Sequence, residues 1–314
     1  MTSGSAAEAG PGTEPAGKIA LVANPVAGKG RARTLADRVA ARLAAAGADV
    51  TPLAGGSPEE SLELCRQAVA DGAGTLAVLG GDGMVHLALQ AVAGTGTALA
   101  VLPAGTGNDI ARNLGLPHGG ADALDTATDL VVHGVPTPVD AARTSTADGA
   151  ERWWIGVMCA GFDSAVNERA NRMRFPKGPF RYDLAGYVEL IRLHPYPFTV
   201  TLDGERTELP ALMIQLGNGR AFGGGMIVCP GADLHDGMLD LTIWEPVGRL
   251  ALVRQQPRIY KGTHVEHGRV QVRRAREVTL DAPGVTTYAD GERLGPLPAT
   301  VTCVPGAVRV LLPR

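Results

Sequence analysis

The residues best suited to chemistry stand together at Gly80-Gly81-Asp82-Gly83, where three glycines surround one carboxylate. The apolar run Leu76–Leu79 before them is typical of a buried strand, and the spaced Leu, Ala and Val residues after them are typical of a helix. Glycines let a backbone approach a ligand closely, and free N–H groups at a helix start attract an anion. The stretch therefore predicts a phosphate-binding turn, in which Asp82 would hold Mg²⁺ or accept a proton. The alternative interpretation is a tight turn in which Asp82 only caps the helix.

Two other apolar runs also end in glycine-rich turns. Ile19–Ala23 is followed by Asn24-Pro25-Val26-Ala27-Gly28-Lys29-Gly30, and Ala98–Leu102 by Pro103-Ala104-Gly105-Thr106-Gly107-Asn108-Asp109. The first turn lacks the Gly-Lys-Ser/Thr ending of a P-loop, so that alone it is weak evidence for a nucleotide. In an open parallel α/β sheet, however, the carboxyl ends of the strands lie along the edge where ligands bind. We therefore expect the three turns to converge and to bind a nucleotide.

The elements that would position these turns alternate between strand and helix. A helix from Leu35 that Gly47 ends, a strand over Ala48–Leu53 and a helix over Ser57–Ala70, capped by Ser57, separate the first two turns. After Asp140 the pattern changes to short strands with turn signals, which is typical of antiparallel sheet. These strands are expected at Trp153–Met158, Phe198–Leu202, Ala211–Leu216, Leu239–Trp244, Glu277–Asp281, Thr286–Ala289, Thr300–Val304 and Val308–Leu312, with hairpin turns at Asp203-Gly204, Asp236-Gly237 and Asp290-Gly291.

The fold class predicted from this pattern is α/β with two domains. Residues 18–140 would form a parallel α/β nucleotide-binding domain, and residues 141–304 a mostly antiparallel, β-rich domain that takes the substrate. Residues 305–314 are candidates for a return to the first domain. Residues 1–17 are rich in Gly, Ala, Pro, Ser and Glu without periodicity, and we interpret them as a disordered tail.

Composition limits the classes of partner. Residues 1–140 carry 8 Lys and Arg against 14 Asp and Glu, a net charge of −6, whereas the remainder carries 21 against 18, a net charge of +3, which argues against a nucleic-acid partner. The scattered Cys65, Cys159, Cys229 and Cys303 indicate neither a zinc site nor a disulfide framework, and are typical of reduced thiols in a cytoplasmic protein. The sequence shows no signal peptide and no apolar run near the roughly 18 residues that cross a bilayer, so we expect any membrane contact to be peripheral.

The chain resembles the diacylglycerol kinase catalytic superfamily, which includes sphingosine and ceramide kinases and bacterial lipid kinases and is related to NAD kinases. The resemblance spans Lys18 to Arg314. It rests on the ordered motifs Asn24-Pro25-x-x-Gly28-x-Gly30, Gly80-Gly81-Asp82-Gly83, Pro103-x-Gly105-Thr106-Gly107-Asn108-Asp109-x-Ala111-Arg112, Gly161-Phe162-Asp163, Gly217-Asn218-Gly219 with Gly223-Gly224-Gly225, Asp236-Gly237-x-Leu239-Asp240 and Asp290-Gly291-Glu292. It implies an ATP-binding α/β domain, a β-rich second domain and transfer of the γ-phosphate of ATP to a lipid hydroxyl.

The resemblance also implies which residues bind the nucleotide. They are Asn24, Pro25, Val26, Ala27, Gly28, Gly30, Gly80, Gly81, Asp82, Gly83, Met84, Val85, His86, Gly105, Thr106, Gly107, Asn108 and Asp109. Family members usually have Thr after Gly-Gly-Asp-Gly, followed by Asn and Glu, whereas this chain has Met84, His86 and Leu87. Met84 lacks a hydroxyl for a phosphate but keeps its backbone N–H. His86 is a polar substitute for Asn in our interpretation, and a less favoured candidate for a catalytic base.

Two acidic sites in the second half follow from the same resemblance. Similarity to bacterial lipid kinases implies Mg²⁺ bound by the Asp236 carboxylate and by the backbone carbonyls of Asp233 and Met238, a ligand set that suits a hard cation. A plain hairpin turn at Asp236 is the alternative. In Asp290-Gly291-Glu292, the family relation makes Glu292 the candidate base for the lipid hydroxyl, with Asp82 as organiser of metal and phosphate. Asp82 as the base stays open.

Two basic segments are candidates for membrane contact. Residues 168–194 interleave Arg and Lys with aromatic residues, and residues 249–276 form a second basic stretch. This composition suits an anionic membrane surface, although a solvated face over a packed helix or strand is the commoner explanation. Arg174, Lys177 and Arg181 could instead help to hold ATP phosphates.

The sequence therefore predicts a lipid kinase, associated peripherally with the inner face of the cell membrane, that uses Mg²⁺ and ATP to convert diacylglycerol to phosphatidic acid. Another lipid alcohol, such as a sphingoid base, ceramide or monoacylglycerol, is the alternative within this class. A nucleotide-binding regulatory protein without turnover is the alternative outside it, because of Met84, His86 and Leu87. The oligomeric state, including a homodimer, stays open.

Overall fold

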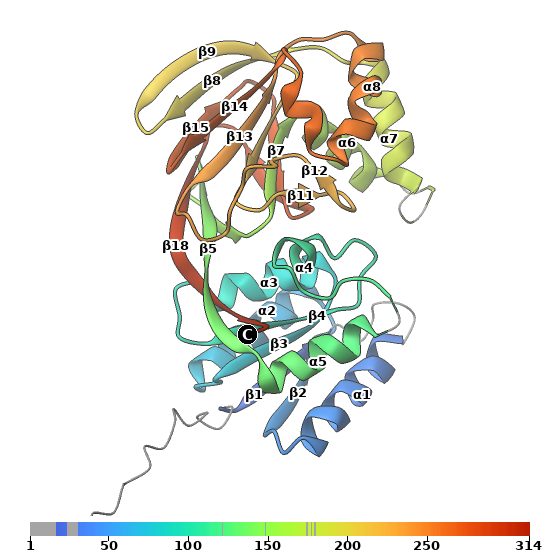
Figure 1. Ribbon diagram of the computed structural model, residues 1–314, viewed down its shortest axis with the longest axis vertical. Coiled ribbons are helices and arrows are strands. Elements are labelled where there is room, and N and C mark those ends of the chain that lie inside the picture. The colour runs from blue at the N-terminus through green and yellow to red at the C-terminus, as the bar shows by residue number, and fades with distance from the viewer. Residues whose placement is uncertain are drawn as a thin grey trace, which may run out of the picture.

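Strands alternate with helices through the first lobe of the computed structural model, which describes residues 17–23, 31–120, 122–147, 149–173, 175–176, 178 and 180–314. The lobe, at the bottom of Figure 1, is built from β1 (Ile19–Ala23), α1 (Arg31–Ala45), β2 (Val50–Ala54), α2 (Pro58–Ala70), β3 (Thr75–Gly80), α3 (Asp82–Val92), β4 (Ala98–Pro103), α4 (Asp109–Asn113) and α5 (Ala123–His133). Its strands β2, β1, β3 and β4 are parallel and lie in that order. The turn at Ser57 behaves as predicted, because its hydroxyl accepts the N–H of Glu60 at 3.2 Å and caps α2.

Helices cover both faces of this parallel sheet, which explains its almost unbroken apolar strands. Ala20, Val22, Leu76 and Val78 pack toward α2 and α3, in one buried cluster. The alternate strand residues Ile19, Leu21, Ala77 and Leu79 pack toward α1 and α5, in another. Successive side chains of a strand point to opposite faces of the sheet, so alternate residues of the same strands belong to the two clusters.

The second lobe is rich in antiparallel strands. It holds β6 (Glu151–Trp154), β7 (Val157–Gly161), α6 (Phe162–Arg172), α7 (Phe180–Ile191), β8 (Tyr196–Leu202), β9 (Glu205–Ala211), β10 (Met213–Gly217), β11 (Ala221–Phe222), β12 (Met226–Ile227), β13 (Leu239–Trp244), α8 (Arg249–Ile259), the 3₁₀ helix η1 (Thr263–Glu266), β14 (Val270–Ala275), β15 (Glu277–Asp281), β16 (Thr286–Ala289) and β17 (Glu292–Pro296). The order β14-β13-β10-β7-β16-β17 makes one sheet, in which every pairing is antiparallel. The α/β fold class, with a parallel first half and a β-rich second half, is therefore confirmed.

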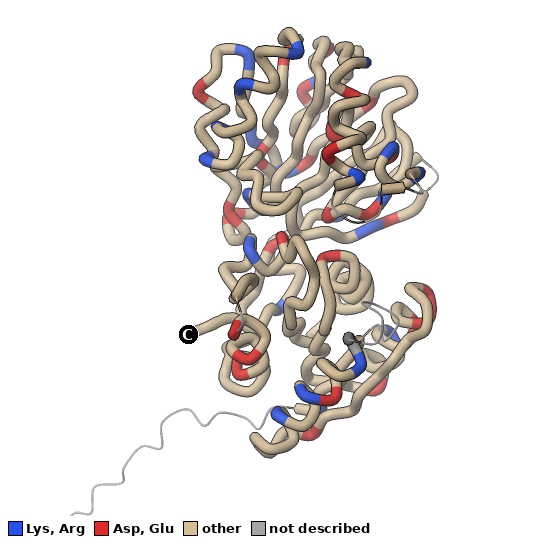
Figure 2. Tube along the Cα trace, turned by 90° about the vertical axis from the view of Figure 1, so that its right-hand side faces the viewer, with Lys and Arg blue, Asp and Glu red and all other residues tan. Residues whose placement is uncertain are grey.

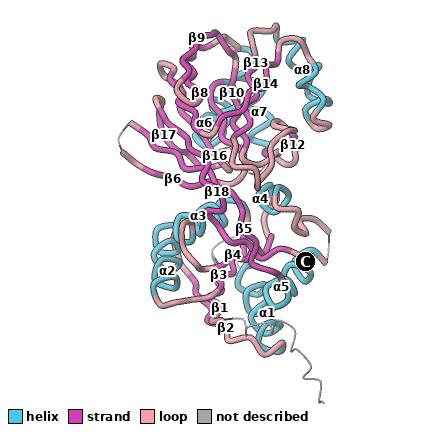
Figure 3. Tube along the Cα trace, turned by 60° about the vertical axis from the view of Figure 1, so that its left-hand side comes forward, coloured by secondary structure: helices cyan, strands magenta, loops and turns pink. Residues whose placement is uncertain are grey.

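Two long strands run through both lobes. β5 (Val135–Thr146) and β18 (Ala299–Leu312) pair along their whole lengths, and in Figures 1 and 3 they form the connection between the lobes. Near its end β18 pairs with β4 in the lower lobe, and near its start with β15 in the upper. The pairing shifts between Val304 and Val308. There the buried Asp140 carboxylate accepts the N–H groups of Gly306 at 2.8 Å and Gly237 at 2.7 Å.

Most predicted strands of the second lobe are found, and two details differ. β13, β15 and β16 have the predicted limits. The strand expected over Trp153–Met158 was wrong, because the chain turns at Ile155-Gly156 and splits it into β6 and β7. The hairpin expected at Asp236-Gly237 was also wrong, because this turn joins no pair of neighbouring strands and instead donates the Gly237 N–H to Asp140.

Charge is mixed over the described surface. Figure 2 shows Lys and Arg interspersed with Asp and Glu along both lobes. In the part of the chain that the structure describes, we find no helix with the length and apolar character needed to cross a membrane.

Candidate active site

The glycine-rich turns after β3 and β4 lie against each other. Gly80 pairs with Pro103 at the ends of these strands. A Cβ on Gly105 would lie only 2.6 Å from the Cα of Gly81, so both positions need glycine at this close approach. α3 then begins at Asp82 with Gly81 as its N-cap, which offers no side chain to the first N–H groups of the helix. Backbone donors at the start of an eleven-residue helix are thus open to an anion such as a phosphate.

Asp82 is a partly buried carboxylate at this junction. Its Oδ1 accepts the backbone N–H of Ile110 at 2.8 Å, so the side chain ties the start of α3 to α4. Burial raises the pKa of Asp82, and the nearby Asp109 and Asp290 carboxylates raise it further. Negative charge is therefore concentrated here, which suits a bound cation.

The loop before α4 adds a second carboxylate. Asn108 has a left-handed backbone with φ of 52°, and its Oδ1 accepts the Gly105 N–H at 2.9 Å, which shapes the turn. A Cβ on Gly107 would lie 3.1 Å from Asp82 Oδ2 and 3.7 Å from Asp109 Oδ2, so both carboxylates border this glycine. Asp109 Oδ1 is buried and accepts no hydrogen bond from the described residues, although Arg112 Nε lies 3.5 Å from it, and Asp109 Oδ2 accepts the Gly224 N–H at 2.7 Å. Two carboxylates that border the same glycine fit Mg²⁺, which prefers oxygen ligands.

The Asp290-Gly291-Glu292 turn of the upper lobe reaches this site, and its two acids take different positions. Asp290 is buried, and its carboxylate accepts the N–H groups of Ile155 at 3.1 Å and Gly156 at 2.9 Å. Glu292 is exposed, and its Oε1 lies where a Cβ on Gly83 would be 2.8 Å away. The two acids therefore differ in kind: Asp290 holds the backbone turn between β6 and β7, and Glu292 is free to meet a ligand at the start of α3.

Met84, Val85 and His86 lie on the first turns of α3. Met84 packs over the preceding turn, since a Cβ on Gly80 would lie 2.6 Å from Met84 Cβ. Val85 is buried in the cluster that packs α2 and α3 on the parallel sheet. His86 is buried, its Nδ1 lies 3.7 Å from Asp290 Oδ2, and this nitrogen has no hydrogen-bond partner among the described atoms. His86 therefore lies next to Asp290, which belongs to the upper lobe.

A large cavity leads from these acids into the upper lobe. Its volume is about 850 Å³, and Asp82, Asp109 and Asp290 line one part of it together with Thr106 and Gly107. The remaining walls come from β7, α6, α7, α8 and the β11–β12 hairpin, and are largely apolar, with Phe162, Val166, Leu190, Phe222, Met226, Leu252 and Ile259 among them. A charged end and an apolar body are what an amphipathic molecule such as a lipid alcohol requires.

Sequence reasoning missed three residues of this region. Asn113 at the end of α4 clamps the lobes together: its Oδ1 accepts the N–H groups of Arg220 and Ala221, both at 2.9 Å. Asp163, a cavity residue, accepts a short hydrogen bond from the Gln215 amide, and burial raises its pKa to about 6. Asp163 stood in a recognised motif, which was the available signal, whereas Asn113 and Gln215 carried none.

The three residues expected to bind Mg²⁺ lie elsewhere. Asp233, Asp236 and Met238 precede β13 and are absent from the described cavity lining. The Asp236 carboxylate is paired with Arg274 and accepts the Met238 N–H at 3.0 Å. A cation there would have to displace Arg274, so this arrangement does not fit it, and the assignment stays a prediction. The described residues also hold no cluster of three or more His, Cys, Asp or Glu suited to a metal.

The remaining predicted nucleotide residues, Asn24, Pro25, Val26, Ala27, Gly28 and Gly30, lie outside the described residues, as do Arg174 and Lys177. Arg181 is described, and it lines the large cavity. Its guanidinium stacks on the ring of Tyr182, with 5.0 Å from Cζ to the ring centre.

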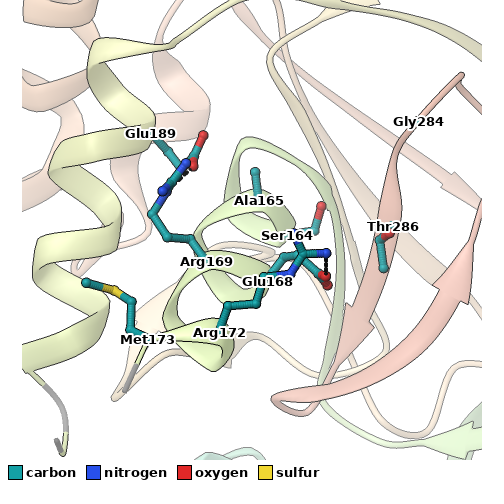
Figure 4. Close-up of a pocket in the computed structure, with 9 residues that line it drawn as sticks. All are labelled: Ser164, Ala165, Glu168, Arg169, Arg172, Met173, Glu189, Gly284 and Thr286. Atoms are coloured by element: carbon teal, nitrogen blue, oxygen red, sulfur yellow. Dashed lines mark hydrogen bonds and ion pairs between the residues drawn. The ribbon is translucent and has the colours of Figure 1, made fainter. Parts of the chain in front are cut away.

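A smaller cavity of about 430 Å³ lies beside α6 and α7 (Figure 4). Its charged residues are already paired, Arg169 with Glu189 and Arg172 with Glu168. Balanced ion pairs leave no net charge to select a ligand, so the large cavity is the better candidate.

Known proteins resemble this chain along nearly all of its length. Residues 18–144 match the diacylglycerol kinase catalytic domain, and residues 156–312 match the YegS C-terminal NAD kinase beta sandwich-like domain. A diacylglycerol kinase of Mycobacterium tuberculosis (strain H37Rv) is 44% identical over 299 residues, which cover 95% of this chain and 96% of that protein. A probable lipid kinase YegS-like of Xanthomonas oryzae pv. oryzae is 31% identical over 259 residues, or 79% of this chain and 82% of that protein.

A solved structure supports the fold. The crystal structure of a diacylglycerol kinase from Bacillus anthracis str. Sterne has a TM-score of 0.71 to this chain, with 21% sequence identity, and covers 96% of this chain and 98% of its own. At this identity the likeness concerns the arrangement of elements alone.

Proposed function

The chain belongs to the diacylglycerol kinase family of lipid kinases, and from that membership we propose that it transfers the γ-phosphate of ATP to the hydroxyl of diacylglycerol. The observation that carries the proposal is that Asp82 lines a cavity with apolar walls, while Glu292 Oε1 lies beside Gly83, the residue that follows Asp82. A kinase for a membrane alcohol needs acidic groups next to apolar walls, because the reacting hydroxyl of the alcohol is polar and the rest of the alcohol is not.

The nucleotide would bind with its phosphates at the start of α3. Without side chains, Gly81 and Gly105 would let the phosphates approach the backbone of both turns, and the first N–H groups of α3 would donate to them. Asp82 and Asp109 would hold Mg²⁺, which would neutralise charge on the phosphates. Phosphoryl transfer depends mainly on such positioning and charge compensation.

Glu292 would act as the general base. In the step we propose, the lipid hydroxyl oxygen bonds to the γ-phosphorus, the bond from this phosphorus to the β–γ bridging oxygen breaks, and Glu292 takes the hydroxyl proton. Its exposure supports this role, since the carboxylate is open to a ligand bound at the start of α3. Asp290 is a poorer candidate, because both of its oxygens already accept backbone N–H groups.

The identity of the lipid rests on similarity. The Mycobacterium tuberculosis relative named a diacylglycerol kinase is 44% identical to this chain over 299 residues, a closer match than the YegS-like lipid kinases at 27–32%. Apolar walls do not distinguish one hydrocarbon chain from another, so monoacylglycerol, a sphingoid base and ceramide are the competing substrates.

The test is transfer of labelled γ-phosphate from ATP with Mg²⁺ to diacylglycerol, monoacylglycerol, sphingosine and ceramide in mixed micelles. We expect labelled phosphatidic acid as the main product, and a loss of 10²-fold or more in kcat for Glu292→Gln with unchanged binding of ATP. Labelling of another lipid would replace diacylglycerol in the proposal. ATP binding without any lipid product would favour a regulatory protein of the same fold, with Met84 the first residue to restore to Thr.

A further inference from the structure

Most of the large apolar side chains that the structure leaves exposed gather on one part of the upper lobe. Among the described residues ten are exposed, and eight of these lie within residues 175–191 and 250–260. The other two, Val135 and Val272, lie on β5 and β14. Exposed apolar side chains that gather in this way mark a surface that binds an apolar partner.

On α7 the exposed residues share one face of the helix. Phe180, Leu184, Tyr187 and Ile191 are spaced by four, three and four residues, and their exposed fractions are 63, 36, 68 and 71%. Apolar residues at this spacing normally face the core of a protein. Here the stripe faces outward, while Ala185 is the buried residue of the same helix.

α8 carries a second outward stripe next to the first. Leu250, Val253 and Tyr260 are spaced by three and seven residues and are 62, 44 and 48% exposed. Both helices line the large cavity and are seen at the upper right of Figure 1. Arg249 fixes their ends together, because its Nε and Nη2 donate to the carbonyls of Leu190 and Ile191 at 3.0 and 2.7 Å. We call the exposed residues Phe180, Leu184, Tyr187, Ile191, Leu250, Val253 and Tyr260 the α7–α8 face.

The α7–α8 face borders a row of uncompensated positive charge. Residues 249–261 include Arg249, Arg254, Arg258 and Lys261 and no acidic residue. Arg254, Arg258 and Lys261 are exposed, are spaced by four and three residues, and form no ion pair with any described residue. Arg254 directly follows Val253 and Lys261 directly follows Tyr260, so basic and apolar residues lie next to each other, as on an amphipathic helix at a lipid surface.

The α7–α8 face also borders the large cavity. Tyr187, Val253 and Tyr260 are both exposed on this face and part of the cavity wall. A molecule held against the face would thus stand at an apolar entrance to the cavity that ends at Asp82 and Asp290.

We propose that the α7–α8 face docks into the headgroup region of a bilayer containing anionic lipid, and that the lipid substrate passes from the bilayer into the cavity between α7 and α8. This inference rests on the proposed function. Anionic lipid fits the row of Arg254, Arg258 and Lys261, with each basic residue near the surface adding to attraction. A second copy of the chain fits less well, because a two-fold contact would set this basic row against itself.

The experiment is flotation of the full chain with vesicles of phosphatidylcholine, with or without 30 mol% phosphatidylglycerol. We expect binding to the anionic vesicles, and at least a tenfold loss for the triple variant Phe180→Gln, Ile191→Gln and Leu250→Gln, whose residues do not line the cavity. The matched control is the double variant Val135→Gln and Val272→Gln, which also replaces exposed apolar residues by Gln, but outside the α7–α8 face. It should bind the anionic vesicles as wild type does.

A kinetic comparison separates docking from chemistry. Phosphorylation of dioctanoylglycerol, dispersed as monomers, should be unchanged in the triple variant, whereas phosphorylation of long-chain diacylglycerol in anionic vesicles should fall at least tenfold. Failure of wild type to phosphorylate any lipid would overturn the proposed function, and flotation would still report on docking. Equal vesicle binding by wild type and triple variant would overturn the docking proposal. The docking proposal would also be overturned if wild type formed a dimer and the triple variant were a monomer that bound vesicles as wild type does.

Discussion

Asp82 combines a structural contact and a chemical role in one side chain. Its Oδ1 accepts the Ile110 N–H, and the amide oxygen of Asn could accept the same bond. Asp82→Asn should therefore fold with a thermal midpoint near that of wild type and lose nearly all phosphoryl transfer, because the negative charge that would hold Mg²⁺ is gone. Circular dichroism melts and the labelled-phosphate assay measure the two properties. Turnover near that of wild type would remove Asp82 from the mechanism.

Asp163 predicts a pH-dependent stability. Burial raises its pKa from 3.8 to about 6, so the folded protein holds this proton at a higher pH than the unfolded chain does. Below about pH 4, Asp163 therefore does not change the free energy of unfolding. As the pH rises from 4 to 6 this free energy falls, and above pH 6 the loss is complete, at most about 3 kcal/mol. Asp163→Asn keeps an acceptor for Gln215 and removes the titration.

The variant Asp163→Asn should thus be more stable than wild type at pH 8 and similar to it at about pH 3.5. Urea denaturation of both proteins at several pH values measures the difference. An offset between them that stays constant with pH would mean that Asp163 acts through packing rather than through its charge.

At the scale of elements, the start of α3 meets the start of β17 through Gly83 and Glu292. A Cβ at residue 83 would lie 2.8 Å from Glu292 Oε1, and the end of a flexible side chain can move away from such a contact. Gly83→Ala should therefore displace the Glu292 carboxylate and lower kcat by about tenfold, part of the effect expected of a general base. Ala favours a helix over Gly by about 0.5–1 kcal/mol, so a weakened α3 would not explain the loss.

A double-mutant cycle identifies the cause. If Gly83→Ala acts by moving Glu292, it should lower kcat no further in the presence of Glu292→Gln. Multiplicative losses in the double variant would show that the added methyl group acts elsewhere, for instance on the phosphate donors of α3.

At the scale of the whole molecule, the lobes share β5 and β18, and Asp140 holds the point where they pass from one lobe to the other. Asp140 is buried, and its two oxygens accept the N–H groups of Gly237 and Gly306. Asn has a single acceptor oxygen, so Asp140→Asn leaves one of these donors without a partner. We expect a loss of about 1–3 kcal/mol in the free energy of unfolding.

Urea denaturation followed by tryptophan fluorescence checks the value for Asp140→Asn. The matched control is Asp125→Asn on α5, where the carboxylate pairs with Arg38 on the surface, with 40% of the Asp125 side chain and 53% of the Arg38 side chain exposed. That substitution should change stability by less than about 1 kcal/mol. A loss no larger than the control would mean that the crossing point is not held by Asp140.

Much of this molecule was predictable from residues that are neighbours in the chain. A glycine-rich turn between a strand and a helix is a local feature, so Gly80–Gly83 and Gly105–Asp109 could be identified as candidate phosphate turns from their own sequence. The same holds for the capped helix at Ser57 and the strands β13, β15 and β16. The ordered series of motifs was enough to indicate the lipid kinase family, which the comparisons confirm.

Tertiary structure alone decided what residues far apart in the chain do to each other. Asp290 and Glu292 are neighbouring acids in one turn, yet Asp290 accepts the N–H of Gly156, 134 residues away, while Glu292 reaches Gly83. The continuous β5–β18 pair, the carboxylates around Gly107 and the outward stripe on α7 are of the same kind. Local pattern sets which backbone form a segment prefers, but the partners of a buried carboxylate and the face of a helix that stays exposed depend on how the whole chain packs.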